Sequence, residues 1–285
     1  MKHSARVTAQ LLSWFFVAIA FGLFVARNVP EQAAAKELSQ TTYIILIVAV
    51  IGISALLWYL AMRKMKVENV EKIFAIGIAL ALIDFLQRFF GGLLPDPWWA
   101  RGIIGAAVGI SFYHLVMWLF SAMQSSWRMV RKLLPISNVL MIVLVSTAGA
   151  MVGVGMQPWA MAIILFAAAC YDAWAVWHSG TMQKMAKYFM ARRVIPGIAV
   201  AKPQKEKFAL LGGGDILFIV AMSASFWRVQ PVMMYISAAW MSLAVLFLFG
   251  ISEKKKFYPA LPFIFGGMMM AYLTGVFLYA LGVLA

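Results

Sequence analysis

The feature that most constrains this chain is a series of apolar runs that recur from one end of the sequence to the other. A run of about 20 apolar residues is long enough to cross the roughly 30 Å hydrocarbon layer of a bilayer as a helix. Hydrophobic residues make up 64% of the 285 positions and charged residues 12%. Soluble domains are about half apolar and about a quarter charged. We therefore predict an all-α, polytopic membrane protein.

Nine runs of this kind predict nine transmembrane helices. Their approximate limits are 10–26, 43–62, 73–94, 102–122, 134–155, 158–177, 208–227, 231–250 and 261–284. The longest segment between runs separates the first six predicted spans from the last three. It divides the chain into a six-helix part (1–180), a basic loop (181–207) and a three-helix part (208–285).

The Lys and Arg residues alternate between the loops. If the N-terminus is cytoplasmic, the even-numbered loops hold most of these residues and the odd-numbered loops hold few. Short cytoplasmic loops carry an excess of Lys and Arg. We therefore predict a cytoplasmic N-terminus, an extracytoplasmic C-terminus, and a first run that is retained as a span. Basic residues in the loops that face the cytoplasm explain the net charge of +14. We therefore predict the lipid bilayer, and no nucleic acid, as a partner.

Ionisable residues inside predicted spans are costly and each needs an explanation. Asp84 and Arg88 lie four residues apart on one predicted helix, with the acid first, which is the favourable order for an ion pair. We predict that they form a structural ion pair. His114 has no second histidine or thiol at ligand spacing, so no metal site is predicted.

Asp172 and Asp215 differ from that pair because neither has a basic residue within one helical turn. Asp172 precedes His178, taken as the cytoplasmic end of its span, by six residues, and Asp215 follows the start of its span at Phe208 by seven. At about 1.5 Å per residue, both lie roughly 10 Å from the same membrane face. If the sixth and seventh helices are neighbours, the two carboxyls meet.

Two carboxyls in contact do not both ionise easily, so the pair holds one proton between them. One carboxyl then acts as general base on a water molecule, and the other donates a proton to the carbonyl oxygen of a peptide bond. Asp172 and Asp215 are therefore predicted to hydrolyse peptide bonds within the membrane.

Two neighbouring motifs favour the same chemistry. Gly212, Gly213 and Gly214 precede Asp215, and three glycines in a span indicate a backbone that bends or is closely approached. Pro259 and Pro262 bracket the start of the ninth predicted span and bias the backbone between them away from helix.

Three motifs thus occur in order: Tyr171-Asp172, the run from Gly212 to Asp215, and Pro259-Ala260-Leu261. On a nine-span chain with a cytoplasmic N-terminus, this set resembles the presenilin and signal peptide peptidase family of GxGD intramembrane aspartyl proteases. The run from Tyr171 to Gly180 looks most like the archaeal homologues.

The resemblance implies an aspartic endopeptidase that cleaves transmembrane helices or signal peptides after they unwind. It implies no metal and no organic cofactor, and a place in the cell membrane of a prokaryote. Asp172 and Asp215 would be the catalytic dyad, and Tyr171 would pack beside them. The residues implied to admit the substrate or to border the site are Gly212, Gly213, Gly214, Pro259, Ala260 and Leu261.

Two alternatives remain open. A prepilin-type peptidase also uses a GxGD motif and a second aspartate, although nine spans and Pro259-Ala260-Leu261 do not favour it. A proton-coupled transporter could use Asp172 and Asp215 as proton carriers. The sequence shows no internal repeat, which transporters of that kind often have. It does not indicate the natural substrate or the oligomeric state.

Overall fold

The computed structural model describes residues 5–28, 98–178, 189, 193, 195, 197–202, 208–252 and 258–283. The chain forms two compact units. One unit is Asn28–Leu133, and the other combines Met1–Arg27 with Leu134–Ala285. Two predicted spans (43–62 and 73–94) lie outside the described residues, and so do Asp84 and Arg88.

The described part of the chain is mostly helical. Its helices are α1 (Ala5–Asn28), α4 (Trp98–Ser125), α5 (Trp127–Val154), α6 (Pro158–Trp177), α8 (Gly213–Ser225), α9 (Pro231–Ile251) and α10 (Leu261–Ala280). Six of these helices are long and apolar enough to cross a membrane, and α8 is apolar but shorter. The chain is therefore an integral, multi-pass membrane protein. The total of nine spans and the placement of the termini stay predictions.

The structure corrects the predicted seventh span at its start. Gly197–Ala201 (β1) and Phe208–Gly212 (β2) form an antiparallel pair, with Ile198 opposite Leu211 and Ala199 opposite Leu210. The helix α8 begins only at Gly213. A short apolar run has no periodicity that separates a buried strand from a helix. For this reason the sequence pattern wrongly assigned residues 208–212 to a helix.

The helix α5 packs closely against α8 and α1. A Cβ atom added at Gly149 would lie 2.8 Å from the carbonyl oxygen of Leu217, and one added at Gly153 would overlap the carbonyl oxygen of Ala221. The buried Ser146 hydroxyl donates a 2.8 Å hydrogen bond to the carbonyl oxygen of Ala18. Glycines at such positions let helix backbones approach closely, so the backbones of α5 and α8 lie in direct contact.

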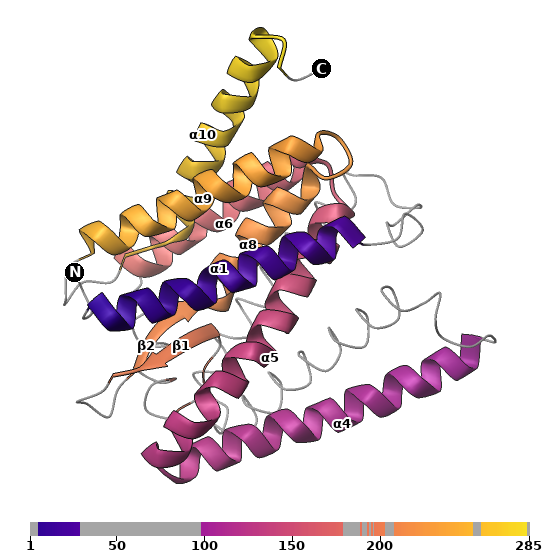
Figure 1. Ribbon diagram of the computed structural model, residues 1–285, viewed down its shortest axis with the longest axis vertical. Helices are drawn as coiled ribbons and strands as arrows, with labels where there is room; N and C mark the ends of the chain where they lie inside the picture. The colour runs from indigo at the N-terminus through magenta and orange to yellow at the C-terminus, as the bar shows by residue number, and fades with distance from the viewer. Residues whose placement is uncertain are drawn as a thin grey trace. The chain divides into compact units, whose positions relative to one another are not determined.

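The helices α9 and α10 also pack through a glycine. A Cβ atom at Gly267 would lie 2.8 Å from both the Cα atom of Met241 and the carbonyl oxygen of Trp240. The Trp240 indole N–H donates a 2.9 Å hydrogen bond to the Thr274 hydroxyl. The middle of α10 is therefore held against α9, and α10 also contacts α6 (Figure 1).

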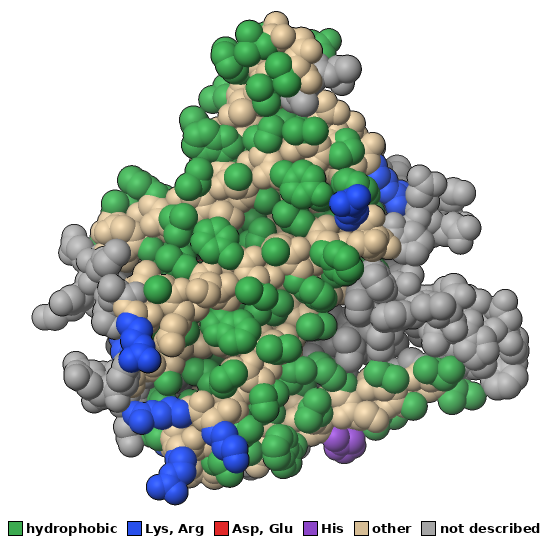
Figure 2. Space-filling model, viewed as in Figure 1, with side chains coloured by type: hydrophobic (Ala, Val, Ile, Leu, Met, Phe, Trp, Pro, Cys, Tyr) green, Lys and Arg blue, Asp and Glu red, His purple; other side chains and the backbone are tan. Residues whose placement is uncertain are grey.

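Hydrophobic side chains cover most of the described surface on the face shown in Figure 2. The charged side chains in view among the described residues are all Lys or Arg. Many large apolar residues are exposed on the helices, including Phe166 and Trp174 on α6 and Phe247 on α9. An apolar exterior of this extent fits a lipid environment rather than water.

Candidate active site

Asp172 lies in the last two turns of α6 and is buried, with only 5% of its surface exposed. Its Oδ2 atom accepts a 3.1 Å hydrogen bond from the backbone N–H of Leu261. The backbone N–H of Ala260 also donates to this carboxylate. The structure thus brings two of the three sequence motifs, Tyr171-Asp172 and Pro259-Ala260-Leu261, into direct contact.

The position of Leu261 explains this contact. Leu261 is the first residue of α10, and Ala260 is the residue that caps the helix. The first N–H groups of a helix have no partner within the helix, and the N-terminal end carries partial positive charge. A carboxylate from a neighbouring helix meets both needs. Asp172 therefore serves as the acceptor that completes the N-terminus of α10.

Asp215 is the third residue of α8 and is half-buried. Its carboxylate accepts a hydrogen bond from the backbone N–H of Gly212, the residue that caps α8. An acid at the third helical position that bonds back to the cap residue is one half of a capping box. This bond holds the Asp215 side chain back toward the end of β2.

The helices that carry the two carboxyls, α6 and α8, are in contact. The Asp172 carboxyl acts electrostatically on that of Asp215, so the two groups are close in space. Their levels in the bilayer were predicted by counting helical rise from Phe208. That count does not hold, because residues 208–212 are extended and Asp215 lies in the first turn of α8.

The three glycines before Asp215 have different surroundings. A Cβ atom at Gly212 would lie 3.1 Å from the Asp215 Oδ2 atom, and Gly213 is buried. Gly214 is exposed, and a Cβ atom added there would meet nothing within 4 Å. A side chain at Gly212 would therefore press against the carboxylate that folds back toward it. Gly214 instead borders open space beside Asp215.

Two further residues predicted from the sequence, Tyr171 and Pro259, make no hydrogen bond to Asp172 in the described part of the chain. Tyr171 is 42% exposed, and its ring lies 6.2 Å from that of Trp174 on the outer side of α6. Successive helical residues point about 100° apart, which separates the Tyr171 ring from the direction of Asp172. Pro259 is buried next to Ala260.

The pattern of charged residues gave no indication of Asn138 or of the strand pair. Asn138, on α5, is 1% exposed and bonds to the backbone of Ala199 in β1. A signal was present, because a buried amide in an apolar span needs hydrogen-bond partners. The short apolar run Gly197-Ile198-Ala199-Val200, between Pro196 and Pro203, is also compatible with a buried strand.

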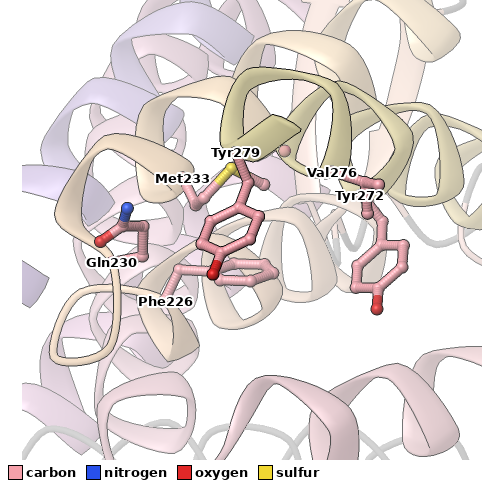
Figure 3. Close-up of a pocket in the computed structure, with 7 residues that line it drawn as sticks. Phe226, Gln230, Met233, Tyr272, Val276 and Tyr279 are labelled. Atoms are coloured by element: carbon pink, nitrogen blue, oxygen red, sulfur yellow. The ribbon is translucent and has the colours of Figure 1, made fainter. Parts of the chain in front are cut away.

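A cavity of about 270 Å³ lies at the other end of α8 (Figure 3). It is lined by Phe226, Gln230, Met233, Tyr272, Gly275, Val276 and Tyr279. Phe226 follows the last residue of α8, whereas Asp215 lies in its first turn. At about 1.5 Å per residue, the cavity is roughly 16 Å along the helix from the carboxyl pair. It is therefore a separate feature from the candidate active site.

The chain was compared with protein families, curated proteins and solved structures. No family model and no curated protein matches the sequence. Two solved structures of a presenilin family intramembrane aspartate protease are similar. In the P2 crystal form the TM-score is 0.60 at 16% identity, over 93% of this chain and 96% of that chain. In the C222 form it is 0.55 at 15% identity, over 94% and 99%. The likeness shows that this chain has the same fold as those structures.

Proposed function

We propose that this chain is a GxGD intramembrane aspartyl protease of the presenilin and signal peptide peptidase family, with Asp172 and Asp215 as its catalytic pair. One observation carries the proposal. The buried Asp172 carboxylate bonds to the backbone of Leu261 and acts on Asp215, so the three sequence motifs meet at one place. The shared fold with a presenilin family protease agrees with this assignment.

The chemistry follows from a shared proton. Two neighbouring carboxyls hold one proton between them, which leaves one base and one acid. The base removes a proton from water as its oxygen attacks the carbonyl carbon of the peptide bond. The acid protonates the carbonyl oxygen, and the amine then leaves with a proton returned from the pair. No metal or organic cofactor takes part in this scheme.

The break in the seventh span supports access of water to the two carboxyls. With 13 residues, α8 covers about 20 Å, which is less than the roughly 30 Å hydrocarbon layer. Extended backbone at membrane depth is tolerated where it is covered by protein or borders water. We infer that water reaches the carboxyls at the junction of β2 and α8.

The outer edge of β2 favours an extended substrate. Ala199 uses its N–H and carbonyl groups to bond to Asn138, so it does not exchange hydrogen bonds with Leu210 opposite. Backbone groups of paired residues alternate in direction, so the N–H and carbonyl of Leu210 point away from β1. Among the described residues no backbone partner meets that edge. An unwound substrate segment pairing there would lie two residues from Gly212 and next to Asp215.

The substrates in this proposal are transmembrane helices or signal peptides that unwind before cleavage. Gly214 leaves room for the substrate, while Gly212 and Gly213 shape the backbone before Asp215. Pro259, Ala260 and Leu261 border the site opposite, and Tyr171 lies on the helix of Asp172. The nine-span topology with a cytoplasmic N-terminus, the three-part division of the chain, and the cell membrane of a prokaryote as its location belong to the same proposal.

Cleavage of a labelled transmembrane peptide by the purified protein in detergent tests the proposal. The wild type and Gly266→Ala should cut, because a Cβ atom at Gly266 meets nothing within 4 Å. Asp172→Asn and Asp215→Asn should not cut. A wild type that never cleaves such peptides, or an Asp215→Asn protein that cleaves as well as the wild type, would refute it. Proton-linked uptake into vesicles would point to transport instead.

A further inference from the structure

The strand β1 is held at its outer edge by a side chain of another helix. The Asn138 amide oxygen accepts a 3.0 Å hydrogen bond from the Ala199 N–H, and its amide nitrogen donates a 2.9 Å bond to the Ala199 carbonyl oxygen. Both residues are buried, with Asn138 1% exposed and Ala199 fully buried. The Asn138 side chain therefore pairs with β1 as a third strand would.

This pairing decides which edge of the two-stranded sheet is available. An unpaired strand edge presents N–H and carbonyl groups that attract a further strand. On β1 the groups of Ala199 are already satisfied by Asn138. On β2 those of Leu210 point outward, on the strand that continues directly into Gly212 and α8. A segment that adds to this sheet is thus directed to the edge nearest Asp215.

The same pairing sets the position of the sheet relative to α8. Gly197 lies opposite Gly212, and a Cβ atom at Gly197 would be 2.8 Å from the Gly213 nitrogen. The backbone of β1 therefore touches the first residue of α8. Any displacement of β1 would be transmitted to Gly213, two residues before Asp215.

The helix α5 contacts both α8 and the strand β1. Gly149 and Gly153 on α5 fix the position of α8 through backbone contacts with Leu217 and Ala221. Asn138 lies about three helical turns before Gly149 and so on the same face of α5. One rigid helix thus holds both the sheet and α8, the two elements that must keep a fixed relation at the site.

We propose that Asn138 is a positioning residue, which closes the outer edge of β1 and aligns β2 so that an extended substrate presents one defined peptide bond to Asp172 and Asp215. This inference rests on the proposed protease function. Asn138 does not touch the reacting atoms. Its effect passes through Ala199 and Gly197 to the start of α8.

The test compares Asn138→Leu with Ser146→Ala in purified protein. Leucine branches at Cγ as asparagine does, and it removes both hydrogen bonds to Ala199. Ser146→Ala is the matched control, because it removes another buried hydrogen bond of α5 that leads to Ala18 in α1 and not to the sheet. Cleavage rate and product termini of a labelled transmembrane peptide are measured, the termini by mass spectrometry, with folded protein quantified by size-exclusion chromatography.

For Asn138→Leu we expect kcat/KM per folded molecule to fall about tenfold to a hundredfold. We also expect the product termini to spread over neighbouring peptide bonds. Ser146→Ala should keep the wild-type termini even if it melts at a lower temperature. A purely structural role would reduce the folded fraction and leave the termini unchanged.

Ala199→Pro is a second variant that opens the same contact from the strand. Proline lacks the N–H that donates to the Asn138 amide oxygen. The Ala199 N–H does not bond to β2, and proline is tolerated at strand edges of this kind. It should spread the product termini in the same way. The inference would be overturned if Asn138→Leu and Ala199→Pro fold and give the wild-type product termini. It would also be overturned if both variants fail to fold while Ser146→Ala folds. A wild type that does not cleave would instead refute the proposed function.

Discussion

The Oδ2 atom of Asp172 on α6 accepts a 3.1 Å hydrogen bond from the backbone N–H of Leu261, which lies 89 residues further along the chain. This contact joins the candidate catalytic pair to the N-terminus of α10. It also gives Asp172 two roles, because the carboxylate both belongs to the proposed chemistry and completes a helix end. The two roles are separable by substitution.

Substitution of Asp172 should separate activity from stability. Asp172→Asn keeps an oxygen that accepts from the Leu261 N–H, whereas Asp172→Ala leaves that partly buried N–H without its partner. Both variants should lose cleavage activity by about a thousandfold or more. Asp172→Ala should also be less stable than Asp172→Asn by about 1 kcal/mol. Thermal unfolding in detergent and peptide cleavage measure the two effects, and equal stability of the two variants would argue against the capping role.

Gly214→Ala should reduce activity without harming the fold. A Cβ atom there meets nothing within 4 Å, and alanine favours a helix over glycine by roughly 0.5–1 kcal/mol. We expect unchanged or higher stability and a fall in kcat/KM of about tenfold, because the methyl group occupies space beside Asp215. Gly266→Ala, which is equally unobstructed, is the control and should keep full activity. Wild-type kinetics for Gly214→Ala would mean that the substrate does not pass this point.

Gly212→Ala should act on Asp215 itself. The new Cβ atom would lie 3.1 Å from the Asp215 Oδ2 atom. The carboxylate would shift by a few tenths of an ångström, which weakens its hydrogen bond with the backbone N–H of residue 212. We expect a larger loss of kcat than of substrate binding, because the base is displaced while the approach at Gly214 stays open. Binding of a peptide inhibitor alongside kcat measures this. Weakened binding with unchanged kcat would contradict the assignment.

Gly153→Ala should loosen the contact between α5 and α8. Its Cβ atom would overlap the carbonyl oxygen of Ala221, and overpacking of this kind costs about 1–3 kcal/mol. Gly155→Ala is the matched control, since its Cβ atom would lie 3.5 Å from the nearest atom, an ordinary contact. Melting temperatures in detergent should fall for Gly153→Ala only. Equal melting of both variants would mean that α5 does not hold α8 rigidly.

Activity should depend on pH with a bell-shaped profile. The proposed pair works with one proton shared between Asp172 and Asp215, so both loss and gain of a proton remove the active form. The kcat/KM of peptide cleavage from pH 4 to 9 measures this, with size-exclusion profiles at each pH as the control for unfolding. A flat profile over that range would contradict a shared proton.

The sequence determined the membrane architecture because its signal is local. Apolar runs of sufficient length predicted the six long helices within the described residues, and α6 was predicted with its observed limits. Glycines, prolines and buried acids were also recognisable one by one. The acids stand out because ionisable groups are costly in a membrane, and the glycines and prolines stand out because they weaken or break a helix. The ion pair of Asp84 and Arg88 stays a prediction, because it lies outside the described residues.

Only the tertiary structure decided how these pieces meet. An apolar segment such as residues 208–212 suits a buried strand as well as a helix, and its pairing with β1 settles the choice. Asn138 bonds across 61 residues and Asp172 across 89. Such contacts depend on packing between helices, which local composition does not encode. The amino-acid pattern thus predicted Asp172 and Asp215 as the catalytic pair, while packing brought Leu261 to Asp172 and Asn138 to the strand pair that precedes Asp215.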